Sequence, residues 1–176
     1  MNESRYFIAI IPPPNVLKEI TDLKHEVAER FKSKMALKSP GHITMHMPFR
    51  WKDKKKEELM EMMARLNEEF ITFCVELNGF GFFEPRVVYV NVEENESLRQ
   101  LQKSVVQHCR SDLKILNSNY KDQVFRPHIT IAFRDLKKPM FYEARAYFVT
   151  RKFTTKFHVD HVSLLKHDGT KWQVHS

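Results

Sequence analysis

The chain has 176 residues, of which 42% are hydrophobic and 29% are charged. This length fits one domain with a hydrophobic core, and this composition is that of a globular protein rather than a disordered one. No stretch approaches the ~20 consecutive apolar residues that a membrane-spanning helix needs, so a membrane protein is not expected. The formal net charge of +7 is compatible with a polyanionic ligand but does not require one.

The predicted elements alternate along the chain between strands and helices. Short apolar runs predict strands, and apolar residues at intervals of three and four predict helices. Helices are expected over 14–31, 54–70, 97–113 and 139–148, and strands over 6–11, 36–49, 73–77, 86–92, 124–133, 157–165 and 172–174. Turn-forming residues at 39–41, 78–81 and 168–169 interrupt or separate these strands. The order predicts an α+β fold with helices packed outside one or two sheets, and no Pro- or Gly-rich linker divides residues 1–176.

The two cysteines, Cys74 and Cys109, lie in regular apolar segments without the spacing of metal ligands. We therefore expect them to be reduced core residues in a cytoplasmic protein. The N-terminal residues lead directly into a strand-like segment and lack the pattern of a cleavable signal. No interfacial apolar stripe is left after the helices are packed, so a monomer is expected.

A tetrapeptide that occurs twice is the most informative feature of the sequence. The first copy is His42-Ile43-Thr44-Met45, and the second is His128-Ile129-Thr130-Ile131. The two histidines are 86 residues apart, about half the chain, which is the spacing expected of an internal duplication. A single His-x-Thr on a strand is more often a packing or surface feature. Two near-identical copies, each after a proline and each in an apolar strand, favour a catalytic function.

Alternation along a strand places the polar residues of each copy on one face. His42 and Thr44 are expected to point one way, and His128 and Thr130 to pair likewise, while the apolar residues between them point into the core. Two such strands could present two imidazoles and two hydroxyls to a shared ligand.

This set of side chains suits phosphoryl transfer without a metal. In-line displacement at phosphorus needs a base on the attacking oxygen and an acid on the leaving oxygen, on opposite sides. Histidine has an unperturbed pKa of about 6.5, so one neutral and one charged imidazole can fill the two roles. Threonine hydroxyls can donate hydrogen bonds to the non-bridging oxygens, where negative charge accumulates.

With these motifs the chain resembles the 2H phosphoesterases, specifically the bacterial 2′-5′ RNA ligase-like branch, whose signature is a His-x-Thr/Ser-x motif in each half. The resemblance extends to 5–10 as the opening strand, to 79–90 as the middle hairpin and to 98–109 as the following helix. It implies a bilobal fold in which two antiparallel sheets with outer helices are related by a pseudo-twofold, with His42, Thr44, His128 and Thr130 lining the cleft between the lobes.

The resemblance also implies an activity. Members of the family hydrolyse 2′,3′-cyclic phosphates, usually to 2′-phosphates, or form and break 2′-5′ RNA linkages. An RNA or cyclic-phosphate nucleotide is therefore the expected partner, and no cofactor is expected. By analogy, His128 would activate water and His42 would protonate the leaving 3′ oxygen, although the pseudosymmetry permits the reverse. Hydrolase and ligase directions are not distinguished.

Several other residues are candidates for substrate contacts. Many relatives carry an arginine five residues after the second motif histidine, whereas here that position is Phe133 and the arginine is Arg134. Alternation would place Arg134 beside His128 if the strand persists, and would place His46 beside His42. Further phosphate contacts or surface charges are Arg5, Lys38 and Arg126, and further base-stacking or core residues are Phe83 and Tyr89.

Two rival interpretations remain open at this stage. A metal site could use His42, His46 and His128, but no Asp, Glu or Cys completes it at a spacing typical of metal ligands. An RNA- or nucleotide-binding module could keep the same fold with little turnover. Intact histidines and threonines in both motifs favour the enzyme, because binding alone needs no paired acid and base.

Overall fold

The structure, a computed structural model, describes residues 2–116 and 124–176. The elements in chain order are β1 (Glu3–Ile10), α1 (Pro14–Phe31), β2 (Ile43–Lys52), α2 (Lys56–Glu68), β3 (Phe73–Phe83), β4 (Val87–Val92), α3 (Glu96–Ser111), β5 (His128–Ala132), α4 (Lys138–Phe148), β6 (Thr154–Val159), β7 (Ser163–His167) and β8 (Trp172–Val174). Short 3-10 turns at Met35–Lys38 and Asp53–Lys55 precede β2 and α2.

The strands form two four-stranded antiparallel sheets. Sheet A has the order β2-β1-β7-β8 and sheet B the order β5-β4-β3-β6. The succession β1-α1-β2-α2 is repeated as β4-α3-β5-α4, and each motif strand, β2 or β5, lies at the edge of its sheet. The expected bilobal α+β fold with two pseudo-equivalent halves is therefore confirmed.

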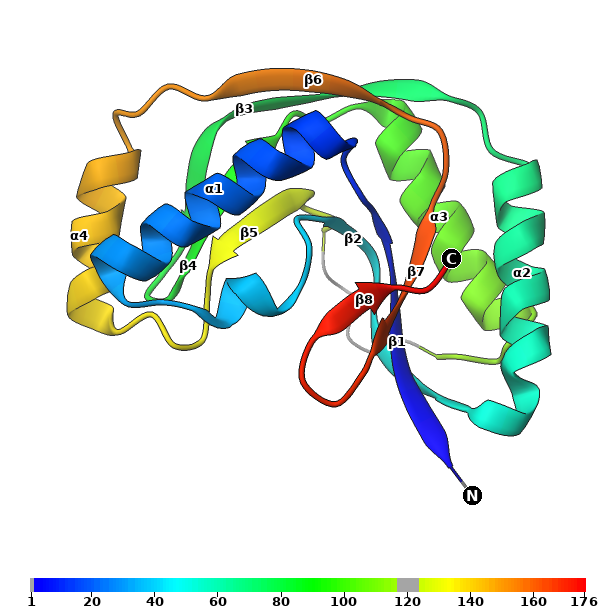
Figure 1. Cartoon of the computed structure of the whole chain (residues 1–176). Coiled ribbons are helices and arrows are strands. Elements are labelled where there is room, and N and C mark those ends of the chain that lie inside the picture. The colour runs from blue at the N-terminus through cyan, green and yellow to red at the C-terminus, as the bar shows by residue number, and fades with distance from the viewer. Residues whose placement is uncertain (1, 117–123) are drawn as a thin grey trace.

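The helices cross between the halves. Helix α1 follows β1 of sheet A but packs against β5 and α4, and α3 follows β4 of sheet B but packs against β2 and α2 (Figure 1). Each sheet is thus covered by a helix that the other half of the repeat supplies. As a result, neither lobe is made from a continuous half of the chain.

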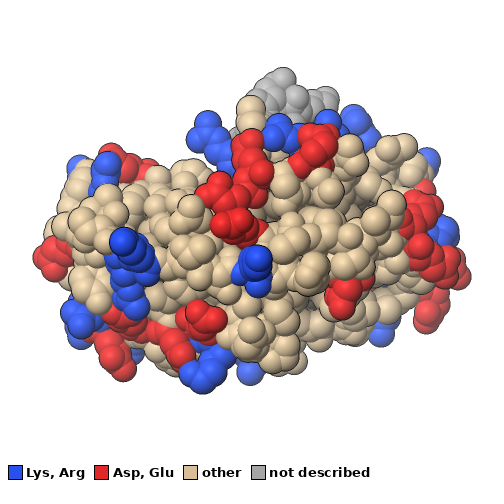
Figure 2. Space-filling view, turned by 90° about the horizontal axis from the view of Figure 1, so that it is seen from above, with Lys and Arg blue, Asp and Glu red and all other residues tan. Residues whose placement is uncertain are grey.

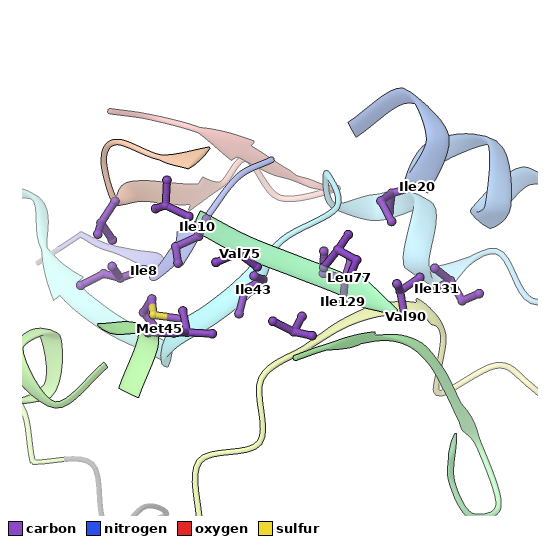
Figure 3. Close-up of a cluster of buried hydrophobic side chains, with 14 of the residues drawn as sticks. Ile8, Ile10, Ile20, Ile43, Met45, Val75, Leu77, Val90, Ile129 and Ile131 are labelled. Carbon is purple, nitrogen blue, oxygen red and sulfur yellow. The ribbon is translucent and has the colours of Figure 1, made fainter. Parts of the chain in front are cut away.

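One hydrophobic core joins the two sheets. Ile43 of β2 lies beside Ile129 of β5 in the middle of this core, with Ile8 and Met45 toward one side of it and Ile131 toward the other (Figure 3). All five belong to a single cluster of buried residues. The core therefore takes one face of each motif strand, which leaves the opposite face for polar side chains.

The course of β3 differs from the prediction. Residues 78–81 were expected to form a turn between two strands, but β3 continues to Phe83 and the chain reverses at 84–86. The pairing with β4 skips from Leu77–Val92 to Phe80–Val90, which is a β-bulge containing Gly79 at φ +69°. The turn-forming residues thus bend a strand instead of ending it.

Other expected boundaries also change. The segment 36–49 starts with a 3-10 turn, so the first motif strand begins only at Ile43. The strand expected over 124–133 is confined to His128–Ala132. The strand expected over 157–165 is two strands, β6 and β7, in different sheets. Cys109 is buried as expected, whereas Cys74 is exposed on β3.

The surface over the outer side of the fold carries both signs of charge. Figure 2 shows lysine and arginine side chains interspersed with aspartate and glutamate on the face seen from above. The net positive charge of the chain is therefore not gathered into a patch on this face. None of the described helices is long and apolar enough to cross a membrane.

Candidate active site

The alternation expected of the two motifs is confirmed by burial. Ile43 and Met45 are completely buried, whereas His42 and Thr44 are partly exposed. In the second copy the isoleucines are completely buried, whereas the histidine and threonine are partly exposed. The apolar residues anchor each strand in the core, so the imidazoles and hydroxyls are left on the opposite face.

The two motif strands are neighbours in space. Edge strands β2 and β5 contact each other, although they belong to different sheets. A positive charge on His128 is also close enough to lower the pKa of His42. The pseudo-twofold thus brings together two imidazoles that are 86 residues apart in the sequence.

The two imidazoles have the same hydrogen-bond environment. Nδ1 of His42 donates to the carbonyl oxygen of Pro40 at 2.8 Å, and Nδ1 of His128 donates to that of Arg126 at 2.7 Å. In each case the acceptor lies two residues before the histidine. Because a carbonyl oxygen can only accept, Nδ1 carries the hydrogen and Nε2 of the neutral ring is an acceptor. Each Nε2 can therefore take a proton from a ligand or, once protonated, return it.

Aromatic rings pack against both imidazoles. The Phe7 ring of β1 lies 4.8 Å from the His42 ring. The rings of Phe83 and Tyr89 lie 5.2 Å and 5.1 Å from the His128 ring, all distances being between centroids. These contacts restrict the orientation of each histidine and exclude water from one side of it. The sequence marks Phe83 and Tyr89 as candidate base-stacking or core residues, whereas nothing in the apolar run 6–11 distinguishes Phe7 from a core residue.

The segment before His42 is held by a buried lysine. Lys24 of α1 is only 2% exposed, and its Nζ donates to the carbonyl oxygens of Ala36 at 3.0 Å and Ser39 at 2.9 Å. Gly41 then passes so close to α1 that a Cβ there would lie 2.6 Å from a methyl group of Ile20. Nothing in the sequence indicated this role for Lys24, because a lysine on a helix is usually solvated.

The environment lowers the pKa of both motif histidines. Burial is the main cause for His42, and the charges of Lys24 and His128 add to it, so its pKa falls to about 4. Burial also lowers the pKa of His128. Hydrogen bonds to the backbone carbonyls oppose both shifts by stabilising the charged rings. In the free protein at neutral pH the neutral form of both imidazoles is therefore favoured.

His46 does not share the exposed face of His42, contrary to the expected alternation. Thr44 pairs with Ala9 and His46 with Ile8, so β2 advances two residues where β1 advances one. This bulge turns His46 inward, where it is 1% exposed and its ring packs edge-on against Phe49 at 5.4 Å.

Arg134 is also placed differently from the expectation. Strand β5 ends at Ala132, and Arg134 has a left-handed φ of +57°, which breaks the alternation that would have aligned it with His128. Its side chain is exposed and its guanidinium lies over the Phe133 ring. Arg126 is exposed beside the second motif. Burial raises the pKa of Tyr89 and the charge of Arg126 partly opposes this shift, so the guanidinium lies near the ring that packs against His128.

The described residues contain no group of three or more His, Cys, Asp or Glu side chains that could hold a metal ion. The donors near the motifs are instead two imidazoles, two hydroxyls and basic side chains. Such a set can bind an anion and move protons at it, which is the chemistry of acid–base catalysis on a phosphate ester.

Comparison of the sequence with known proteins identifies the family that the two motifs resemble. A sequence model of the 2′-5′ RNA ligase superfamily matches residues 12–171. A protein of Geobacillus sp. (strain WCH70) that is named "Putative phosphoesterase" is 34% identical over 134 residues, which are 75% of this chain and 70% of that protein. The RNA 2′,3′-cyclic phosphodiesterase of Geobacillus stearothermophilus is 27% identical over 137 residues, which are 75% of this chain and 42% of that protein.

Solved structures share the fold. Escherichia coli LigT in complex with 3′-AMP superposes with a TM-score of 0.72 at 18% identity, covering 99% of this chain and 97% of LigT. The protein TT0787 of Thermus thermophilus gives a TM-score of 0.69 at 20% identity, covering 98% and 95%. With the family model spanning nearly the whole length, the chain belongs to the 2′-5′ RNA ligase superfamily of 2H phosphoesterases.

Proposed function

We propose that this protein is a metal-independent phosphodiesterase that acts on RNA ends carrying a 2′,3′-cyclic phosphate or on 2′-5′ linkages. The observation that carries the proposal is the equivalent environment of His42 and His128. Both rings donate from Nδ1 to the carbonyl two residues earlier, and both leave Nε2 for the ligand. Such a pair of imidazoles can supply the base and the acid of one displacement.

In the proposed reaction, water attacks the phosphorus of the cyclic phosphate. One neutral imidazole takes the proton of the water while the new P–O bond forms. The P–O3′ bond breaks, and the other, protonated imidazole gives its proton to O3′, which yields a 2′-phosphate. Thr44 and Thr130 donate hydrogen bonds to the non-bridging oxygens, whose negative charge increases in the transition state.

The assignment of base and acid has two arguments that point in opposite directions. The family resemblance makes His128 the base and His42 the acid. The low pKa of His42 favours the reverse, because a base must be neutral before the reaction. An anionic phosphate in the cleft raises the pKa of both rings, which makes the protonated form accessible to one of them.

The test is hydrolysis in the presence of EDTA of adenosine 2′,3′-cyclic phosphate and of a short RNA ending in a 2′,3′-cyclic phosphate. We expect a single isomer of the product. His42→Ala and His128→Ala should each lower kcat by about 10²–10⁴-fold, the range for loss of a general acid or base. His25→Ala, at an exposed position on α1, is the matched control and should keep full activity.

Turnover that survives either motif substitution would overturn the two-histidine mechanism. Nucleotide binding by a folded protein without turnover would indicate instead a binding module with the same fold. Hydrolysis that is lost in EDTA and restored by a divalent cation would overturn the metal-independent reaction.

A further inference from the structure

A basic pocket adjoins the segment that carries His42. It has a volume of about 250 Å³, and its wall includes Lys24, Lys38, Ser39, Lys171 and Trp172. Lys24 comes from α1, Lys38 and Ser39 precede the first motif, and Lys171 and Trp172 come from the C-terminal hairpin. Three lysines from three separate parts of the chain therefore converge on one cavity.

Lys24 places a buried ammonium group, held by hydrogen bonds, in the lining of this pocket. Its side chain is 2% exposed, and within the described residues its hydrogen bonds go to the carbonyl oxygens of Ala36 and Ser39. An ammonium has three N–H bonds, so one is left for a ligand. Burial lowers the pKa of Lys24 to about 8, and an anion in the pocket would stabilise the charged form.

Asp168 is the acid nearest along the hairpin, and its negative charge offsets part of the charge of Lys171. Asp168 accepts hydrogen bonds from the backbone N–H groups of Thr170 and Lys171 at 2.8 Å and 2.9 Å, and from the side chain of Gln173 at 2.7 Å. Its carboxylate is thereby engaged within the turn between β7 and β8. The side chains of Lys38 and Lys171 are exposed, so they can move to contact a ligand in the pocket.

The pocket is connected to the candidate active site by a row of rings. The Trp172 ring contacts the Phe7 ring at 4.7 Å, and the Phe7 ring contacts the His42 ring at 4.8 Å. One aromatic ring thus separates the wall of the pocket from the first motif histidine. Ser39 and Pro40, which also line the pocket, lead directly to His42, and the Pro40 carbonyl accepts from its ring.

We propose that this pocket binds the phosphate on the 5′ side of the reacting nucleotide, so that the enzyme selects RNA ends over mononucleotides. This inference rests on the proposed function, because the cyclic phosphate must occupy the His42–His128 site. A strand that ends in a 2′,3′-cyclic phosphate carries its next phosphodiester on the 5′ oxygen of the terminal nucleoside. Lys24, Lys38 and Lys171 supply charge for that phosphate, and Trp172 offers a ring beside it for the preceding base.

Three substrates separate the contributions of phosphate and base. They are adenosine 2′,3′-cyclic phosphate, the same nucleotide with a 5′-phosphate, and the dinucleotide ApA ending in a 2′,3′-cyclic phosphate. For the wild type we expect the 5′-phosphate alone to raise kcat/KM about tenfold, mainly through a lower KM, since a contact away from the reacting atoms stabilises ground and transition states alike. The dinucleotide should have a kcat/KM at least as far above that of adenosine 2′,3′-cyclic phosphate.

The measured quantity is the ratio of kcat/KM with and without the 5′-phosphate, because effects on folding cancel in it. In the Lys38→Gln/Lys171→Gln double variant this ratio should fall well below the wild-type value, because only Lys24 is left to contact the phosphate. The matched control, Lys138→Gln/Lys152→Gln, removes two exposed lysines that do not line the pocket and should keep the wild-type ratio. A double variant that keeps the wild-type ratio would overturn the proposal, and so would a wild type without any gain from the 5′-phosphate.

A binding measurement distinguishes failure of this inference from failure of the proposed function. If the wild type turns over none of the three substrates, the proposed function fails. Calorimetric titration with ApA ending in a 2′-phosphate and with adenosine 2′-phosphate then tests the pocket by itself. Tighter binding of the dinucleotide that the Lys38→Gln/Lys171→Gln variant loses would support the pocket, and equal loss for both ligands would overturn it.

Discussion

At the scale of single residues, the tautomers of His42 and His128 are determined by the backbone. A carbonyl two residues earlier holds each Nδ1 hydrogen, so the charge state of each ring changes only at Nε2. Burial then favours the neutral form of both rings. The form that can react, with one ring neutral and one protonated, is therefore scarce in the free protein at neutral pH.

This scarcity predicts an acidic pH optimum. The profile of kcat/KM reports the pKa values of the free enzyme, and two interacting histidines titrate as a pair. Because both pKa values are lowered, the singly protonated pair becomes more abundant as the pH falls below about 6.5. We expect a bell-shaped profile of kcat/KM for adenosine 2′,3′-cyclic phosphate with its maximum below that pH. A maximum above pH 7 would contradict the shifts assigned to His42 and His128.

The roles of the two histidines can be separated with an activated leaving group. An aryl phosphodiester releases a phenolate that is stable without protonation, so it bypasses the general acid but not the general base. The variant that lacks the acid should regain activity on the aryl ester by at least about tenfold relative to the cyclic phosphate. The variant that lacks the base should not. Steady-state rates of His42→Ala and His128→Ala on both substrates measure this, and equal effects on the two variants would contradict separate roles.

At the scale of elements, the bulge in β3 places Gly81 opposite Tyr89. The extra residue shifts the alternation, so Phe80 and Phe82 pack against the core while Gly81 and Phe83 lie on the opposite face. A Cβ at Gly81 would overlap the Tyr89 ring. The absence of a side chain therefore lets Tyr89 lie across β3 and pack against His128.

Gly81→Ala should therefore impair catalysis more than folding. The added methyl group displaces Tyr89 and so the His128 ring, and misplacement by about 1 Å can reduce kcat by about 10²-fold. Gly79→Ala is the matched control, because its φ of +69° makes alanine strained by roughly 1–2 kcal/mol while only Asn91 lies near the new methyl group. Thermal unfolding and kcat for both variants test this. Equal kcat in the two folded variants would show that Tyr89 does not position His128.

At the scale of the whole molecule, the crossing helices and one carboxylate join the two motif-bearing segments. Asp135 follows β5, and its carboxylate accepts hydrogen bonds from Ser33 Oγ at 2.7 Å and from the backbone N–H groups of Lys34 and Met35 at 2.7 Å and 3.1 Å. These donors lie between α1 and the first motif. The segment that follows the second motif is thus hydrogen-bonded to the segment that precedes the first motif.

Asp135→Ala should destabilise the fold by about 3 kcal/mol, because three donors lose a charged acceptor and Ser33 is buried. Asp22→Ala is the control, since its exposed ion pair with Lys18 contributes about 0–1 kcal/mol. The measurement is the free energy of unfolding from urea titration. A loss for Asp135→Ala as small as that for Asp22→Ala would mean that this link does not hold the halves together.

Much of the candidate site could be predicted from sequence because it depends on local alternation. The apolar residues on both sides of Thr44 and of Thr130 determine which face of each strand is buried, so the orientation of the motif side chains follows from their neighbours. The same rule failed for His46 and Arg134. A bulge in β2 and a left-handed residue after β5 interrupt the alternation, and neither has a marker such as glycine in the sequence.

The sequence by itself determined the motif residues, their faces and the α+β character of the chain, because these depend on residues a few positions apart. Only the tertiary structure decided that β2 and β5 are adjacent edge strands, that Phe7 and Tyr89 pack against the two imidazoles, and that Lys24 supports the segment before His42. These relations join residues from separate elements. They depend on which strands pair and where a bulge shifts the register, and long-range packing of the whole core decides both.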